Sequence, residues 1–573
     1  MTTSSRTHAH DTHAHDVPAA FSRRAFLAAG GATVSAVALA GCSGKGSQAD
    51  SGTAAPSTDP SRQVTVAMSP SNEPAAGFNP CINWGCGEHV HEPLIQSTLI
   101  VTDEDMSFQN DLATSYACST DGLTWTFVIR DDARFTDGEP VRASDVAFTV
   151  NTIVATPNAE ADLSQVSEAV ATDDTTVELH LTKPCNTLLY TLAVMGIVPE
   201  HAYGDDYGSN PVGSGRYRLA QWDKGQQVIL EANPDYYGDA PSIERVVVVF
   251  MEEDAARAAV MAGQVDMAYT SPVTVGASAG SGDGGLSATD GSAYELAAYD
   301  TVDSRGISLP VVATGATRED GGTTYEAGND VTCNLEVRRA INYGVDRQSI
   351  VDDVLEGFGT CAYSIGDGMP WASEDMRCEL DADRARRLLE DAGWTRGTDG
   401  GIYERDGLRC AFDLWYAAGD TTRQAMAQAF ANQMAGVGIE VNLREGTWDE
   451  IYQRQYADPV MWGWGSNSPA DVYELSHSGG TMNYACYEDA TTDEYLDAAL
   501  AAANVEESYP LWQRSEWDGT DGIAPEGAAT WVWLANVQHL YWKRASLKVA
   551  AQKLQPHGHG WSVLNNVDRW SWA

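Results

Sequence analysis

Helix-like and strand-like segments alternate along most of this chain, and this alternation restricts the fold more than any other feature. Trp125, Phe127 and Ile129 are separated by polar positions, as in a half-buried strand. Residues 381–394 instead follow helical spacing, begin with acidic residues and stop at Gly393. Because the alternation has no regular repeat period, it predicts α/β domains.

The length downstream of residue 62 predicts more than one domain. About 510 residues remain there, which exceeds the size at which a single hydrophobic core stops growing. We therefore expect two or three domains. The sequence pattern predicts further strands at 62–68 and 439–445, a fully buried strand at 243–251, helices from Ser144, at 334–359 and at 421–435, and a surface loop at 275–292.

The N-terminal residues predict export. Arg23 and Arg24 precede a short apolar run that ends in Leu-Ala-Gly-Cys42, which is typical of a twin-arginine signal peptide over residues 1–41. The last four residues resemble a bacterial lipobox, so we expect the Cys42 thiol to be lipidated and to anchor the protein to the membrane. Residues 42–61 lack aromatics and are predicted to form a flexible tether.

Net charge excludes one class of partner, and cysteine usage predicts cross-links. The formal net charge is −46, which repels nucleic acids and anionic lipid surfaces. The same charge would attract cationic solutes, and it is equally consistent with keeping a crowded surface protein soluble. The chain contains ten cysteines. In an exported protein, cysteines other than Cys42 are expected to form some structural disulfides, although their pairing is not specified.

The common sequence motifs of enzymes are absent from the contexts in which they would be catalytic. The chain contains no HExxH pair, no Walker A loop and no GxGxxG loop after a strand. Its GxSxG string at residues 276–280 falls in the Gly/Ser/Ala-rich segment predicted as a surface loop, so it is not predicted to form a nucleophile elbow. This favours a binding protein over an enzyme. A secreted hydrolase with dispersed catalytic groups and an extracellular sensor remain alternatives.

Four long segments resemble family 5 extracellular solute-binding proteins, the peptide, dipeptide and nickel receptors of ABC importers. They are DGLTWTFVIRDDARFTDGEPVRASDVAF, PVGSGRYRL, EVRRAINYGVDR and DADRARRLLEDAGW, and they occur in the order found in that family. The resemblance extends from about residue 62 to the C-terminus.

The resemblance implies an α/β, two-lobed fold of the periplasmic-binding-protein type II, with an extra subdomain in the first lobe. By the family pattern, lobe one covers 62–300 plus 531–573, its subdomain covers about 100–205, and lobe two covers 301–530. The ligand would lie in the cleft between the lobes. The expected protein is a monomeric lipoprotein on the outer face of the cytoplasmic membrane or in the periplasm, which delivers its ligand to ABC permease subunits.

Two segments correspond to the ligand-contacting loops of the family, 78–93 and 461–484. They supply six candidate contacts, although the tryptophans could equally be core aromatics. An aspartate in the second segment would pair with a ligand ammonium. The candidates are Asn83, Trp84, Trp462, Trp464, Asp471 and Tyr484.

Two His-x-His pairs add a metal hypothesis. His89 with His91, and His557 with His559, could each present two imidazoles to one ion, because residues two apart in an extended segment point the same way. His477 could be a fifth ligand. Imidazoles suit nickel or another transition metal. The predicted ligand is therefore a small peptide or, as the alternative, a metal chelate, and no resident cofactor is required.

Overall fold

The computed structural model describes residues 60–83, 85–86, 89–156, 159, 161–280, 293–398, 401–465, 467–558 and 560–573. All of them fall in one compact unit. The predicted signal peptide, Cys42 and the tether as far as residue 59 lie outside these residues. Across the described ranges, no helix has the length and apolarity needed to cross a bilayer.

A seven-stranded mixed sheet forms the first lobe, which we call lobe one. β1 is the predicted strand at 62–68, and it pairs in parallel with both β12 and β13. Its buried Val64 and Val66 contribute to the apolar core of this lobe. The strand order is β10 (Tyr217–Asp223), β11 (Gln227–Ala232), β12 (Arg245–Phe250), β1 (Gln63–Met68), β13 (Met267–Thr270), β26 (His539–Arg544) and β14 (Tyr294–Tyr299).

A six-stranded mixed sheet forms the second lobe, lobe two. Its core includes Phe412 and Leu414 of one strand and Phe430 and Met434 of the helix that follows. The strand order is β18 (Gly359–Cys361), β25 (Trp531–Val537), β15 (Ser304–Ser308), β24 (Val460–Trp464), β22 (Ala411–Ala417) and β23 (Glu440–Gly446).

The chain crosses between the two sheets twice, through short connections. The first runs from Tyr299 at the end of β14 to Ser304 at the start of β15, and the second is Gln538 alone. The predicted return to lobe one at residue 531 is therefore wrong. Residues 531–537 form β25 of lobe two, because this apolar strand is buried along its whole length beside β15.

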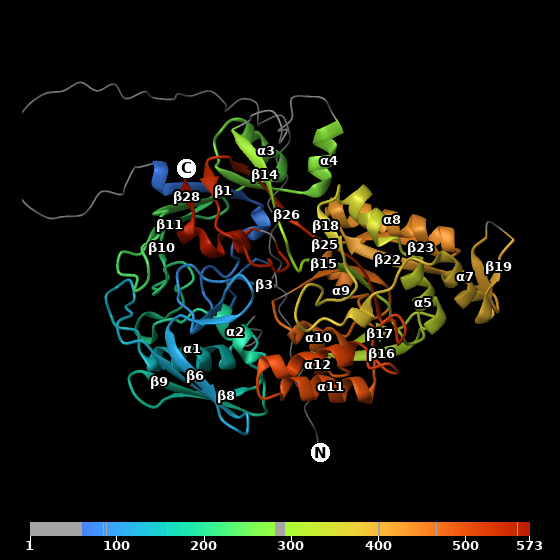
Figure 1. The fold of residues 1–573 in the computed structure, drawn as a ribbon, viewed down its shortest axis with the longest axis horizontal. Helices are drawn as coiled ribbons and strands as arrows, with labels where there is room; N and C mark the ends of the chain where they lie inside the picture. The colour runs from blue at the N-terminus through green and yellow to red at the C-terminus, as the bar shows by residue number, and fades with distance from the viewer. Residues whose placement is uncertain are drawn as a thin grey trace, which may run out of the picture. The chain divides into compact units, whose positions relative to one another are not determined.

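A four-stranded antiparallel sheet with a helix along it forms the subdomain. Its order is β6 (Ala113–Cys118), β7 (Thr124–Ile129), β9 (Thr176–Leu181) and β8 (Val166–Ala171), and α1 (Ala143–Ala155) packs against β8 and β9 (Figure 1). The predicted alternation of β7 is confirmed, since Trp125, Phe127 and Ile129 are its buried residues. Asn186 of this region donates to the Ala499 carbonyl at 2.7 Å, so the subdomain touches lobe two.

Lobe two carries most of the helices, and one of them, α7 (Ala382–Asp391), has the predicted start and stop signals. α7 begins after Asp381, whose carboxylate accepts from the Arg384 amide at 2.7 Å, and Gly393 just beyond it has a positive φ. In Figure 1, α10, α11 and α12 lie together. The helices after α1 are α2 (Leu188–Val194), α3 (Glu253–Met261), α4 (Pro272–Gly280), α5 (Leu335–Gly344), α6 (Arg347–Ser349), α7 (Ala382–Asp391), α8 (Thr421–Val437), α9 (Trp448–Tyr452), α10 (Ala470–Ser476), α11 (Ala490–Leu500) and α12 (Val505–Glu516).

Short strand pairs complete the fold. One of them, the hairpin of β16 and β17, projects from lobe two and reaches the site described below. The two-stranded sheets are β16 (Ala316–Asp320) with β17 (Thr323–Ala327), β2 (Gly85–Cys86) with β3 (His89–Val90), β4 (Ile100–Thr102) with β5 (Phe108–Asn110), and β27 (Leu547–Lys548) with β28 (Ser571–Trp572). A three-stranded sheet contains β19 (Thr395–Arg396), β20 (Tyr403–Arg405) and β21 (Leu408–Arg409).

Three local predictions are wrong. The helix predicted at 334–359 breaks after Gly344, because the Asp346 carboxylate accepts from the Ser349 amide at 3.0 Å and starts a new turn. Residues 275–280 are helical, as the end of α4, and 281–292 lie outside the described residues. The strand at 243–251 alternates between buried and half-buried positions instead of being buried throughout.

The expected disulfides do not form among eight of the nine downstream cysteines. Cys81, Cys118, Cys185, Cys333, Cys361, Cys378, Cys410 and Cys486 are all free thiols. All of them except Cys333 lie in or against two separate apolar clusters, where burial raises the pKa of both Cys81 and Cys410 to about 12. The side chain of Cys86 lies outside the described set.

Candidate functional site

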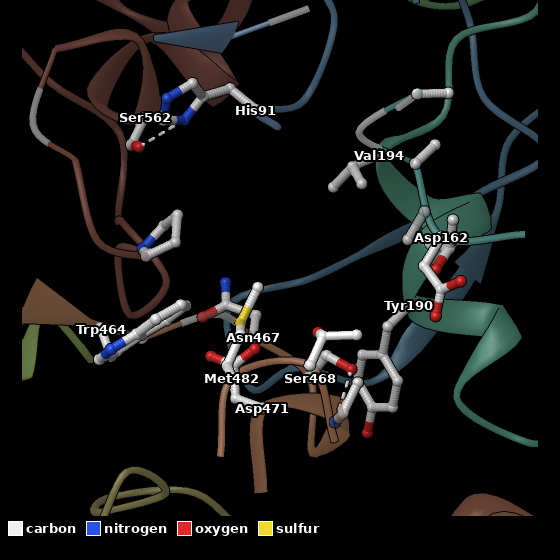
Figure 2. A pocket seen from close by; sticks show the side chains of 18 of the residues that line it. His91, Asp162, Tyr190, Val194, Trp464, Asn467, Ser468, Asp471, Met482 and Ser562 are labelled. Carbon is white, nitrogen blue, oxygen red and sulfur yellow. Dashed lines mark hydrogen bonds between the residues drawn. The ribbon is translucent and has the colours of Figure 1, made fainter. Parts of the chain in front are cut away.

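A cavity of about 1010 Å³ lies between the two lobes and the subdomain. Its walls come from distant parts of the chain, as Figure 2 shows for Ser562 of lobe one, Tyr190 of the subdomain and Trp464 of lobe two. The volume is at the upper end of the range of small-molecule sites, about 300–1,000 Å³. Closing the lobes around a ligand would therefore enclose it on several sides.

A tight turn after β24 directs the next segment into the cavity. Gly465 has a φ of 141°, and a Cβ at this position would lie 1.7 Å from the Val302 carbonyl oxygen. Only glycine fits this combination of backbone angle and close approach. Asn467 and Ser468 follow the turn, and both line the cavity beside Asp471 (Figure 2).

Aromatic rings form the lobe-two wall. Tyr484 lines the cavity and stacks on Trp462, with ring centroids 4.2 Å apart and planes at 10°. Trp462 lies behind Tyr484, where its indole N–H donates to the Ser308 hydroxyl at 3.0 Å. Trp464 lines the cavity directly. Trp462 therefore supports the ligand-facing ring of Tyr484.

Three buried polar atoms on residues that line the cavity have no hydrogen-bond partner among the described residues. They are the indole nitrogen of Trp464 and the amide oxygens of Asn467 and Asn565. An unsatisfied buried donor or acceptor costs about 1–3 kcal/mol. A ligand that offers both carbonyl oxygens and N–H groups would satisfy all three, and a peptide backbone has both.

The lobe-one wall carries an ion pair. Lys553 pairs with Glu92 and donates to the Thr102 hydroxyl at 2.7 Å. Burial, aided by the charge of Arg569, lowers the pKa of Lys553 to about 7. In either protonation state the pair adds no net positive charge to the cavity.

Behind the cavity, a buried charge cluster lies at the two connections between the lobes. The Asp303 carboxylate contacts Arg305 and His557, and His539 lies 3.1 Å from its second oxygen. Burial opposes ionisation of Asp303, but the charge of Arg305 and the contacts with both histidines hold its pKa well below the usual value. Burial lowers the pKa of His557, so Arg305 is the cation that balances Asp303.

The structure separates the predicted histidines. His91 is buried, lines the cavity and lies 2.9 Å from the Ser562 hydroxyl (Figure 2). Burial and the charges of His539 and His557 lower the pKa of His91 to about 4. His477 lies away from the cavity lining, stacked on Tyr473 with centroids 4.4 Å apart.

A ready-made metal centre is not present in the described part of the chain, where no three His, Cys, Asp or Glu side chains are grouped to hold an ion. His557 contacts Asp303 instead of the cavity. The His89 side chain and His559 lie outside the described residues, so the complete four-histidine set stays a prediction.

Of the six residues predicted to contact the ligand, some line the cavity and others do not. Trp464, Asp471 and Tyr484 line the cavity, and Trp462 lies behind it. Asn83 forms a β-bridge with Asn79 and is not among the lining residues. Trp84 lies outside the described residues.

Several residues that line the cavity were not predicted from the sequence. They come from the subdomain, from the β16–β17 hairpin and from the C-terminal segment, which approach the cavity only through tertiary packing. Asn467, Ser468 and Met482 lie inside the predicted 461–484 segment and could have been chosen as polar or flexible contacts there. The missed residues include Asp162, Tyr190, Thr191, Val194, Asp320, Tyr325, Tyr452, Asn467, Ser468, Met482, Lys553 and Asn565.

Two lobes joined by two short connections, with a cavity lined by both, define a two-lobed solute-binding protein. Residues 107–484 match the profile of the bacterial extracellular solute-binding proteins, family 5, middle region. The chain belongs to this family. The family works outside the cytoplasm with ABC permeases, and it is a class of binding proteins.

Relatives and solved structures agree with this assignment. The chain is 34% identical over 420 residues to protein XP55 of Streptomyces lividans, which covers 70% of this chain and 72% of XP55. It is 25% identical over 441 residues to the oligopeptide-binding protein AppA of Bacillus subtilis, covering 72% of this chain and 76% of AppA. NikZ of Campylobacter jejuni, in complex with Ni(L-His), shares the fold with a TM-score of 0.71 at 23% identity, covering 89% of this chain and 100% of NikZ.

Proposed function

We propose that this protein captures a short peptide in the interlobe cavity and delivers it to the permease of an ABC importer. The cavity of about 1010 Å³, lined by both lobes and the subdomain, carries this proposal. Its unpartnered indole N–H and amide oxygens match the alternating acceptors and donors of a peptide backbone. Asp471, on the cavity wall, is suited to the terminal ammonium. AppA of Bacillus subtilis, a relative of the same family, is named as an oligopeptide-binding protein.

Closure of the lobes is the working step in this proposal. A ligand that contacts both lobes favours the closed state by its differential affinity, and two short connections suit a hinge. The residues from Asp300 to Asp303, with Gln538, would absorb the rotation. The closed form then presents a joint surface to the permease.

A titration of the purified full-length protein with a library of two- to five-residue peptides tests the proposal. Peptides of this length are short enough for a binding cavity of about 300–1,000 Å³. We expect a rise in the thermal unfolding midpoint, because binding to the folded state stabilises it. Small-angle scattering should show compaction with the same peptides. Peptides recovered cleaved would show an enzyme instead of a receptor, and saturation without compaction would contradict closure.

A metal chelate is the second candidate ligand, favoured by the position of His91. Its ring lies on the cavity wall and is neutral near pH 7, because its pKa is lowered to about 4. A neutral imidazole can bind nickel. Elemental analysis, with thermal titrations of Ni²⁺ and Zn²⁺ in the presence and absence of free histidine, distinguishes the two. A midpoint that rises only with metal and histidine together would favour the chelate.

We also propose that Cys42 is lipidated after twin-arginine export and that the protein acts as a monomer held at the membrane. Changing Cys42 to serine should move the exported protein from the membrane fraction to the medium or periplasm, because serine offers no thiol for the lipid. Immunoblots of the two fractions measure this. Cys333→Ser, a matched change in lobe two, should leave the protein membrane-bound. If the Cys42→Ser protein stays with the membrane, something other than this lipid anchors it.

A further inference from the structure

The cavity wall has more negative than positive charge. Four carboxylates line it, those of Glu92, Asp162, Asp320 and Asp471. Among the described lining residues, Lys553 is the one lysine or arginine, and any charge on it is matched by Glu92. The remaining carboxylates therefore give the cavity a net negative charge at neutral pH.

Two of these carboxylates reach the cavity from different parts of the fold. Asp162 belongs to the subdomain and accepts from the Ser164 amide at 3.0 Å. Asp320 ends β16 of lobe two and accepts from the Tyr456 hydroxyl at 3.0 Å. In the described structure neither forms an ion pair, and Arg318 nearby donates to the Gly480 carbonyl at 2.9 Å. Both carboxylates can therefore pair with a ligand cation.

Other polar groups on the same wall also favour a ligand rich in donors. The amide oxygens of Asn467 and Asn565 are buried acceptors without a described partner. Trp464 is only 8% exposed, and its unpartnered indole and its ring face the same cavity. In Figure 2, Asn467 and Asp471 lie on one side of the cavity and Asp162 beside Tyr190 on another. Aromatic rings next to carboxylates suit the apolar stem and charged end of a basic side chain.

We infer that the peptide bound here is cationic, carrying at least one basic side chain besides its terminal ammonium, and that Asp162 and Asp320 select it. The inference rests on the proposed function and narrows its substrate class. The distribution of the two carboxylates means that a basic side chain meets one of them whether it points toward the subdomain or toward lobe two. An acidic peptide would meet like charge on both sides.

Isothermal titration of the full-length protein with three tripeptides tests the inference. The probes are Ala-Lys-Ala, Ala-norleucine-Ala and Ala-Glu-Ala, of which the first two share a four-carbon stem and differ in charge. We expect the lysine peptide to bind about fivefold more tightly than the norleucine peptide, the size expected for one partly exposed ion pair. Added salt should reduce this preference.

Paired substitutions assign the preference to the two carboxylates. The double variant Asp162→Asn with Asp320→Asn should bind the lysine and norleucine peptides about equally, because both amides keep the shape and lose the charge. Asp205→Asn, a charge-matched change at an exposed position away from the cavity lining, should keep the preference. Equal binding of the two peptides by the unmodified protein, or a preference retained in the double variant, would overturn the inference.

A non-peptide polycation separates failure of the charge inference from failure of the proposed function. If no peptide binds, spermidine is titrated into the same proteins. Binding of spermidine that the double variant loses would support a cation-selective cavity and overturn the peptide proposal. No binding of either peptides or spermidine would overturn both.

Discussion

Changing Asp303 to alanine should lower the free energy of unfolding by about 3–5 kcal/mol, the loss expected when one partner of a buried ion pair is removed. The Asp303 side chain is 3% exposed and contacts Arg305, which is 9% exposed. Without the carboxylate, the guanidinium would remain buried with no balancing anion. His539 and His557 would also lose their contacts with Asp303. Chemical denaturation of the two proteins at pH 7 measures the difference.

Asp300 provides a matched control on the same connection between the lobes. It is exposed and accepts from the Gln538 amide at 2.8 Å, so Asp300→Ala should change the unfolding free energy by no more than about 0.5 kcal/mol. If Asp303→Ala proves equally mild, the buried cluster is not a stabilising feature of the connection.

The same cluster predicts how acid affects stability. The folded pKa of Asp303 is held well below the value of about 3.9 for an unfolded chain. Its contribution is therefore complete above about pH 4 and is lost as pH falls through the lower, folded pKa. Asp303→Asn cannot ionise, so the stability difference between it and the unmodified protein should narrow as pH falls below about 4.

Changing Trp464 to alanine should weaken peptide binding by about 30-fold or more, as for an aromatic residue that dominates a binding surface. The ring lines the cavity beside Tyr484, with centroids 6.3 Å apart, and is 8% exposed without ligand. Its removal would take away both an apolar contact surface and an indole donor that has no partner in the described protein. Isothermal titration with the tightest tripeptide measures the loss.

Trp464→Phe separates these two contributions and guards against an alanine variant that folds poorly. Phenylalanine keeps an aromatic face but loses the N–H and one of the two indole rings, so we expect affinity to fall at least about fivefold, the value of one neutral hydrogen bond. Because the indole N–H has no described partner in the free protein, the unfolding midpoint without peptide should fall less than in the alanine variant. Full affinity in both variants would place the peptide elsewhere.

Local patterns in the sequence predicted individual elements well where packing agreed with them. The alternation of Trp125, Phe127 and Ile129 and the capped helix after Asp381 were correct, because both depend on nearest neighbours in the chain. The long helix predicted at 334–359 was wrong, since one carboxylate, that of Asp346, competes for a backbone amide. The resemblance to family 5 identified the fold and the cavity-lining segment at 461–484.

What the sequence by itself determined is the family, the alternation of helices and strands, and the three cavity residues Trp464, Asp471 and Tyr484. Tertiary structure alone decided which other residues join them. Asp162 and Asp320 lie far apart in the chain, and only the packing of the subdomain and lobe two brings both to one cavity. Packing also placed His557 against Asp303 at the connection between the lobes, where burying one carboxylate required cationic and hydrogen-bonding partners from distant segments.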